Sequence, residues 1–302
     1  MARFETPSRL SVNGTIDPML EHAHAIADAA AQLTPLSHSA SQLIALNSTP
    51  NVSATDLVSV IANDQVLAAS LLREANSAAS AAVDPISTVD VAIVRLGMSR
   101  VMSLAVRLSL SKQMSQGVDQ YGLAEGQLGL LSITGSIAAE LVREQAEMKM
   151  RPELTTAALL RDIGMLVLAQ FLDAPHQMLL DVVRESGVAL ADSERMVLDA
   201  THGEAGGLLC QIWKLPDTVR LGVQYHHDPF ECTDPIAHGV FVADTIAHHV
   251  AVRTGGNWSH SAPDDELVAA SAAAIGFDVS RLDGIVDATI SRFASRNTGL
   301  TL

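Results

Sequence analysis

The sequence predicts an all-α protein, built as a two-lobed helical bundle. Apolar residues recur at the three- and four-residue spacing of amphipathic helices along most of the chain. No segment of any length alternates with the two-residue period of a strand. The most continuously apolar stretch, residues 155–172 (TTAALLRDIGMLVLAQFL), predicts a helix that is buried on nearly every side. We therefore expect the other helices to surround this central segment.

Helix start signals divide the first part of the chain. Asp17 and Pro18 suit an N-cap and a first helical position, and Asp64 suits the N-cap of a later helix. Ser87 with Asp90 resembles a capping box, with Asp in the usual place of Glu. We expect helices over residues 17–33, 36–46, 53–62, 64–75, 87–96 and 101–108.

A polar, glycine-rich stretch at residues 117–129 predicts the boundary between the two lobes. Beyond it we expect helices over residues 130–143, 155–172, 176–186, 192–211, 217–226, 235–252 and 266–296. The chain then divides into an N-terminal lead (1–27), an N-terminal lobe (28–117), a second lobe (118–252), and a loop with a helical tail (253–302). The tail carries too many apolar side chains to leave in water, so we expect residues 263–296 to pack back onto the second lobe.

Composition limits the classes of function. The 19 Lys and Arg against 34 Asp and Glu give a net charge of −15, which disfavours nucleic acid or an anionic membrane surface as a partner. Cys210 and Cys232 have no metal-binding or redox spacing, so we expect neither a disulfide nor a metal there. The first residues lack the apolar core of a secretion signal, and no apolar run reaches the roughly 18 residues that span a bilayer. We expect a cytoplasmic protein without membrane insertion.

One charged pair interrupts the central apolar segment. Arg161 and Asp162 lie in its middle, and unpaired charges are rarely buried. Either the pair marks a functional centre or its remnant, or it lies on one exposed strip of a core helix.

Three parts of the chain together resemble the HDOD family, a signalling relative of the HD-domain phosphohydrolases. They are NDQVLAASLLREANSA (63–78), ISTVDVAIVRLGMSRVMSLAV (86–106), and a block formed by ALLRDIGMLVL (158–168), HGEAGGLLCQIWKLP (202–216) and YHHDP (225–229). The resemblance covers roughly residues 28–252. It implies a helical fold with an HD-domain-like second lobe. It also implies a role as a regulatory module in bacterial-type signalling rather than as an enzyme.

The resemblance also implies a degenerate metal site. HD enzymes use a His, a His-Asp pair and a distant Asp to hold a divalent ion that activates water against a phosphoester. Here Leu131 stands for the first His and Arg161 for the His of the pair, whereas Asp162 is present and Asp244 is the distant Asp. Met165 replaces the Lys that often follows. Leucine and protonated arginine cannot coordinate a metal.

His202, His226 and His227 allow two interpretations. Related two-metal phosphodiesterases carry histidines at similar places, so the three could form a second metal site with Asp244. Alternatively, His226 and His227 end a helix and cap its carbonyl groups, and His202 caps or bridges helices. We expect His248 and His249, near a helix end, to be solvated.

The leading hypothesis is a non-catalytic signalling protein that acts through protein partners and needs no cofactor or metal. A metal-dependent phosphohydrolase acting on a nucleotide or cyclic dinucleotide is one alternative. A small-ligand sensor that uses the former active-site pocket is another. Under the leading hypothesis, Arg161 replaces the metal as the cation beside Asp162 and Asp244, because two carboxylates without a cation repel each other. Arg161 is then buried, and contacts Asp244 or, by rotation of its long side chain, Asp162.

Overall fold

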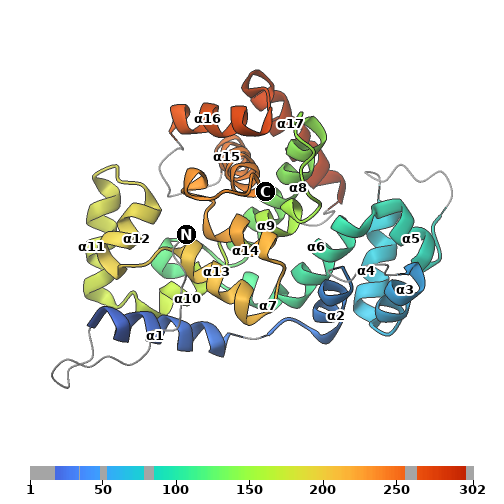
Figure 1. Ribbon diagram of the computed structural model, residues 1–302, viewed down its shortest axis with the longest axis horizontal. Coiled ribbons are helices and arrows are strands. Elements are labelled where there is room, and N and C mark those ends of the chain that lie inside the picture. Colours follow the sequence, from blue (N-terminus) through green and yellow to red (C-terminus); the bar gives the residue numbers. More distant parts are fainter. Residues whose placement is uncertain (1–17, 34, 48–52, 78–84, 256–263, 297–302) are drawn as a thin grey trace.

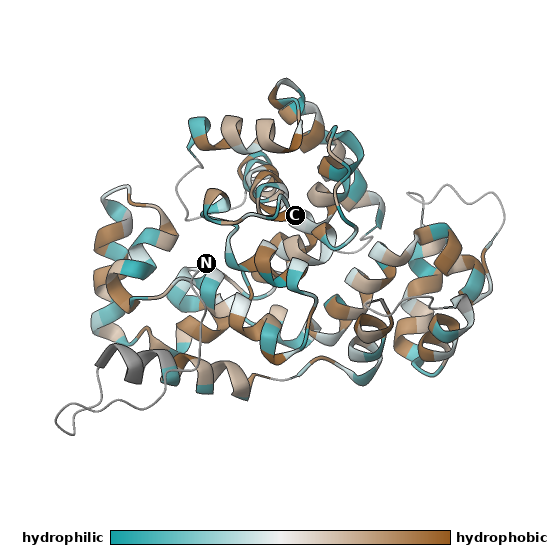
Figure 2. Ribbon diagram, viewed as in Figure 1, coloured by the Kyte–Doolittle hydropathy of each residue, from teal (hydrophilic) through white to brown (hydrophobic). Residues whose placement is uncertain are grey.

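The computed structural model describes residues 18–33, 35–47, 53–77, 85–255 and 264–296, and within these ranges the regular elements are helices. One isolated bridge joins Val118 and Leu123, and the described residues form no strand, so the all-α prediction is confirmed. Most helices carry both hydrophobic and hydrophilic residues (Figures 1 and 2). The α-helices are α1 Pro18–Gln32, α2 His38–Asn47, α3 Ala54–Ala62, α4 Gln65–Ala75, α5 Val89–Leu96, α6 Met98–Ser109, α7 Ser111–Met114, α8 Gln127–Gln145, α9 Leu154–Leu160, α10 Met165–Leu168, α11 Ala174–Glu185, α12 Leu190–Leu198, α13 His202–Ile212, α14 Asp217–Gln224, α15 Ile236–Arg253, α16 Asp265–Ile275 and α17 Leu282–Arg296.

Local capping sets several helix starts in the N-terminal part. Asp64 caps α4, as predicted, by accepting a hydrogen bond from the Leu67 backbone N–H. The predicted capping box at Ser87 is wrong, because α5 begins one residue later with Thr88 as its N-cap. Gly97, with φ of 77°, separates α5 from α6 in a conformation that suits glycine.

The predicted boundary region does interrupt the helices. Between α7 and α8 the chain forms a short 3₁₀ turn, Asp119–Tyr121, and passes through Gly122 and Gly126 with positive φ. No helix crosses the boundary, although α8 begins at Gln127 and so takes in the last part of the glycine-rich stretch. A single apolar core continues on both sides of this break. The division into lobes itself stays a prediction.

The first helix packs against the second part of the chain. α1 contacts α10 and α13, and Figure 1 shows it beneath them, apart from α3, α4 and α5. Residues 28–32, which the sequence assigned to the N-terminal lobe, therefore lie against helices from beyond the glycine-rich stretch. The N-terminal lead before residue 18 lies outside the described residues.

The central segment is not one helix, which corrects the prediction for residues 155–172. α9 ends at Leu160, and after a turn the chain continues as α10 and a 3₁₀ turn, Ala169–Phe171. The turn bonds over three residues, for example from Met165 N–H to Asp162 O. At Gly164 an added Cβ would lie 2.0 Å from His202 O, so the turn packs directly on the start of α13. The break thus places Arg161 and Asp162 beside the first residue of α13.

Burial of the segment is nevertheless as predicted. Residues Leu154–Phe171 are long and apolar enough to cross a bilayer, which corrects the expectation that no apolar run reaches this length, but 78% of this window is buried inside the protein. α9 packs between α6, α8, α14 and α15. Its side chains are therefore covered by other helices of the same chain.

The helix predicted over residues 192–211 is also divided. α12 ends where Asp199 adopts a left-handed conformation with φ of 50°. Thr201 then starts α13 with a capping box in which its side chain and that of Glu204 each bond the other's backbone N–H. Two glycines in α13 allow close packing, because an added Cβ would lie 2.7 Å from Val223 at Gly206 and 2.9 Å from Gln224 at Gly207. This capping box fixes the position of His202.

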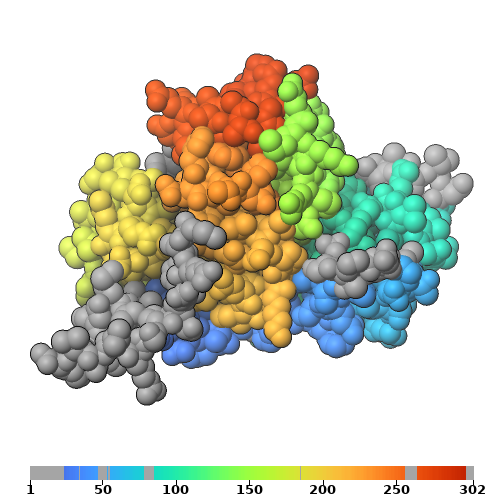
Figure 3. Space-filling view, viewed as in Figure 1, coloured from blue at the N-terminus to red at the C-terminus, as the bar shows by residue number. Residues whose placement is uncertain are grey.

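The C-terminal tail folds back, as predicted. α16 packs on α15, and α17 packs on α8 and α15, which Figure 3 shows as red on orange and green. Ile275, Val286 and Phe293 are buried there. Pro263 lies outside the described residues. Cys210 and Cys232 are free, as predicted.

Candidate functional site

The guanidinium of Arg161 is wholly buried between two carboxylates. Its Nε donates to Asp244 Oδ1 at 2.5 Å, and its Nη2 lies 3.1 Å from Asp162 Oδ2 without hydrogen-bond geometry. Its Nη1 donates to Ala158 O at 2.9 Å and to Leu131 O at 3.3 Å. Burial opposes the charge, but Asp162 and Asp244 outweigh it and raise the pKa of Arg161. The group is therefore a fixed cation.

One glycine in α8 makes room for this cation. A Cβ added at Gly135 would lie 2.1 Å from Arg161 Nη1. Leu131, one helical turn earlier, supplies its carbonyl group to the same nitrogen. The α8 backbone thus serves as part of the guanidinium site, and Gly135 within a long helix is the sequence signal for this close approach.

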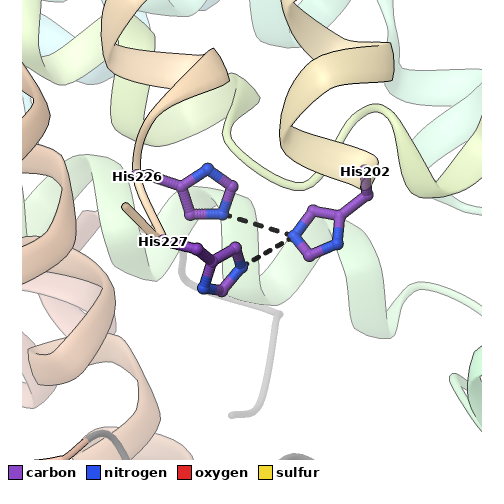
Figure 4. Close-up of side chains that lie close together, drawn as sticks. All are labelled: His202, His226 and His227. Atoms are coloured by element: carbon purple, nitrogen blue, oxygen red, sulfur yellow. Dashed lines mark hydrogen bonds between the residues drawn. The ribbon is translucent and has the colours of Figure 1, made fainter. Parts of the chain in front are cut away.

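Three histidine rings converge beside Asp162. His202 comes from the first turn of α13, and His226 and His227 follow the end of α14. Figure 4 shows the three rings facing one another, with Nε2 of His202 lying 3.3 Å from Nε2 of His226 and 2.9 Å from Nε2 of His227. Asp162 Oδ1 lies 3.7 Å from Nε2 of His202 and 3.8 Å from Nε2 of His226. Three imidazole nitrogens therefore face one small volume, and a carboxylate oxygen lies near two of them.

A buried carboxylate fixes the orientation of His202. Glu194 Oε2 accepts from the backbone N–H of His202 at 2.8 Å and lies 2.7 Å from its Nδ1, while Oε1 accepts from Tyr121 Oη at 2.7 Å. Because a carboxylate accepts, Nδ1 of His202 carries a proton and Nε2 points toward the other rings. Likewise, Nδ1 of His226 lies 2.7 Å from Val223 O and donates to it.

Sequence reasoning missed Glu194 and Tyr121. A signal for Glu194 was present, since it lies four residues from both Leu190 and Leu198 on the buried side of α12. An acidic residue on an apolar helical face is unusual and predicts a buried partner. Tyr121 lies in the glycine-rich boundary and gave no comparable signal.

The charges of this centre are set by burial and by neighbours. Burial raises the pKa of Asp162, against the effect of Arg161. Burial alone would lower the pKa of His202, but Glu194 and Asp162 overcome it and raise that pKa. Burial, followed by the nearby His202, lowers the pKa of His226 to about 3. Without a metal, His202 therefore holds a proton more strongly than an ordinary imidazole, and His226 holds one more weakly.

The geometry gives two ways to satisfy the facing ring nitrogens. A protonated His202 can donate from Nε2 to a neighbouring imidazole. Alternatively, a divalent ion could accept the lone pairs of the three Nε2 atoms and of Asp162 Oδ1, a donor set of the kind that zinc and similar ions take. Metal-binding histidines usually donate their other N–H to a carboxylate or carbonyl group, as His202 and His226 do here.

The six residues that the sequence predicts for this site come together. Asp244 from α15 pairs with Arg161, and Asp162 lies between that pair and the three histidines. The capping interpretation also holds in part, because His226 Nδ1 bonds the Val223 carbonyl group at the end of α14. The prediction for His248 and His249 is wrong, since both lie within α15, where His248 is buried and His249 half-buried.

Comparison with known proteins places this centre in a family. The sequence pattern of the HDOD domain matches residues 33–229, which is more than half of the 302 residues. An uncharacterised protein of Treponema pallidum is 24% identical over 182 residues, and the match spans 59% of this chain but only 34% of that relative. The chain therefore matches about a third of the length of this curated relative.

Solved structures share the fold. An HDOD domain protein of unknown function from Geobacter sulfurreducens superposes with a TM-score of 0.68 at 20% identity, covering 92% of this chain and 100% of that one. A protein of Shewanella amazonensis, whose name assigns it provisionally to the phosphohydrolases, gives 0.64 at 20% identity with coverages of 90% and 95%. A Marinobacter aquaeolei protein, whose name assigns it provisionally to signal transduction, gives 0.65 at 24% identity with coverages of 94% and 66%.

Proposed function

Because the chain belongs to the HDOD domain family, we propose that it is a non-catalytic signalling protein acting through protein–protein contacts. In this proposal Arg161 has taken the place of the divalent ion of the HD phosphohydrolases. The observation that carries the proposal is the buried guanidinium, which bonds Asp244 and lies against Asp162. A permanent cation at this position neutralises both carboxylates and leaves no coordination position there for an ion and its water.

A function through protein contacts has independent support at the surface. Large apolar side chains are exposed on α11 and α12, at the left edge of the molecule in Figure 3. Exposed apolar groups of this kind are typical of surfaces that bind other proteins. They are Met178, Leu179, Val182 and Met196.

Metal analysis of the purified protein, paired with a phosphodiesterase assay on bis(4-nitrophenyl) phosphate, tests the proposal. We expect no stoichiometric metal and no hydrolysis above that of an unrelated control protein, with or without added Mn²⁺. The double variant Leu131→His with Arg161→His should gain metal uptake, because it restores both missing imidazoles beside Asp162. Stoichiometric metal in the wild-type protein would overturn the proposal.

One observation favours a second candidate, a metal-dependent phosphohydrolase. The three histidines and Asp162 Oδ1 could hold one ion, which would supply an activated water. In that case the wild-type protein binds metal, and His202→Ala abolishes binding while Arg161→Ala does not.

The small-ligand sensor in the former active site gains no such observation. Two pockets found in the described part of the chain are lined by other residues, on α6, α8 and the segment around Pro152.

A further inference from the structure

A second charged centre lies between α6 and α8, with α4 and the end of α17 at its rim. It is a cleft with a cavity volume of about 40 Å³. Its polar lining residues are Glu74, Arg100, Ser103, Arg107, Ser136, Glu140 and Arg296.

This cleft is on the other side of α8 from the histidine centre. At 100° per residue, Ser136, Ile137 and Glu140 project roughly opposite to Leu131 and Gly135, which contact Arg161. On α6, Arg100 and Arg107 are seven residues apart and so lie on one face. A ligand in the cleft would therefore not touch Arg161 or the three histidines.

Glu140 accepts from three arginines. Arg100 binds it through Nε and Nη2 at 3.2 and 3.1 Å, and Arg296 through Nη1 and Nη2 at 3.1 and 2.8 Å. Arg292 reaches it at 3.4 Å but makes its shorter contacts, both 3.0 Å, with Glu144. A single carboxylate is thus shared mainly by Arg100 and Arg296.

The charges in the cleft do not balance. Arg292 is matched by Glu144, and Arg107 by Glu74 at 3.3 Å, so Arg100 and Arg296 against Glu140 leave one positive charge in excess. Burial raises the pKa of Glu74, although Arg107 opposes this, so the carboxylate that pairs with Arg107 holds its negative charge less strongly. In a chain of net charge −15, a local positive excess is a departure that calls for an anion.

One buried donor in the cleft has no partner. The Arg296 side chain is 6% exposed, and its Nε has no hydrogen-bond acceptor among the described residues. A buried unpaired guanidinium N–H is costly, whereas an oxyanion would satisfy it.

We propose that this cleft binds a phosphate group, either inorganic phosphate or the phosphate of a small phosphomonoester. Guanidinium groups match the geometry of phosphate oxygens and bind them through paired N–H donors. The cavity has room for about three water-sized groups, at 10–15 Å³ each, so the oxygens of one phosphate fill it and an ester group extends outward. This binding activity is separate from the function proposed above, and it bridges α6 and α17.

Isothermal titration calorimetry at constant ionic strength, with inorganic phosphate and with ribose 5-phosphate, tests the site. Arg107→Gln should weaken binding by about tenfold or more, the loss expected for one charge-assisted hydrogen bond. Glu74→Gln should tighten binding, because it removes a competing carboxylate; a purely structural role for the cleft predicts no such gain. Arg253→Gln is the matched control, since Arg253 pairs with exposed Asp283 and Asp287 elsewhere.

Tighter binding of ribose 5-phosphate than of phosphate assigns the site to a phosphomonoester, and the reverse assigns it to the free ion. Circular dichroism confirms that each variant is folded. The proposal is overturned if neither compound binds the wild-type protein, if Arg107→Gln binds as tightly as Arg253→Gln, or if Glu74→Gln binds less tightly than the wild type.

Discussion

At the scale of single residues, the site around Asp162 and Asp244 depends on one cation, the Arg161 guanidinium, which has no access to water. Arg161 makes its contacts to the half-buried carboxylate of Asp244 and to the buried backbone carbonyl groups of Leu131 and Ala158. Removing it leaves Asp162 and Asp244 without their partner, and an uncompensated buried charge costs more than the pair gains.

Arg161→Ala should therefore lower the free energy of unfolding by about 3–5 kcal/mol, as measured by urea denaturation. Arg253→Ala is the control, because its ion pairs with Asp283 and Asp287 are exposed and should change the free energy of unfolding much less. Equal losses in the two variants would show that Arg161 does not neutralise a buried charge.

His226 gives a pH dependence of known sign. Its pKa falls from an ordinary 6.5 to about 3 in the folded protein, so between these values the unfolded chain binds a proton that the native chain excludes. In the metal-free protein, its contribution to stability is present above pH 6.5 and is lost as the pH falls toward 3, by about 1.4 kcal/mol per unit.

His202 acts in the opposite sense: with a raised pKa, its contribution is full below pH 6.5 and is lost as the pH rises through its folded value. His226→Gln should therefore lose less stability than the wild type between pH 6.5 and 4 in urea titrations. A steeper loss in His226→Gln would contradict the assignment.

At the scale of elements, the central segment decides where the site forms. The sequence predicted its burial correctly, because apolar composition alone sets that outcome. It could not predict the break after Leu160, because the turn at Gly164 packs on the carbonyl oxygen of His202, which lies in a distant part of the sequence. The prediction of a single helix over residues 192–211 was wrong for a local reason, the capping box at Thr201. The three-residue spacing from Thr201 to Glu204 is a sequence signal for this box.

The close packing of α8 on Arg161 gives a test at this scale. Gly135→Ala should destabilise the protein by roughly 1–3 kcal/mol or more, because its methyl group would overlap Arg161 Nη1. Gly284→Ala, in α17, meets nothing within 4 Å and should instead stabilise the protein by up to about 1 kcal/mol through helix propensity. Thermal melting compares the two, and a stabilising Gly135→Ala would show that α8 and Arg161 are not in contact.

At the scale of the whole molecule, the helices on both sides of residues 117–129 share one apolar core. The sequence placed the interruption correctly, because turn residues mark it, but apolar periodicity does not say how closely two helical arrays pack. The site shows the same limit of sequence-based prediction. Motif positions predict its six residues, whereas Glu194 belongs to the site only through its tertiary contacts with Tyr121 and His202.

A shared core predicts that the two arrays unfold together. In urea, circular dichroism at 222 nm, which reports on all helices, should give the same midpoint as tryptophan fluorescence, since both tryptophans follow residue 210. Two separate transitions by circular dichroism would instead support independent lobes.

The guanidinium site also limits which side chains can replace Arg161. Arg161 occupies space above Gly135 and bonds the carbonyl groups of Leu131 and Ala158. An imidazole at the same position is shorter. It would lose the hydrogen bonds to both carbonyl groups and leave an unfilled space beside Gly135. Arg161→His alone would therefore lose these contacts while position 131 still carried leucine, so both positions must change together before the site offers two more imidazole groups.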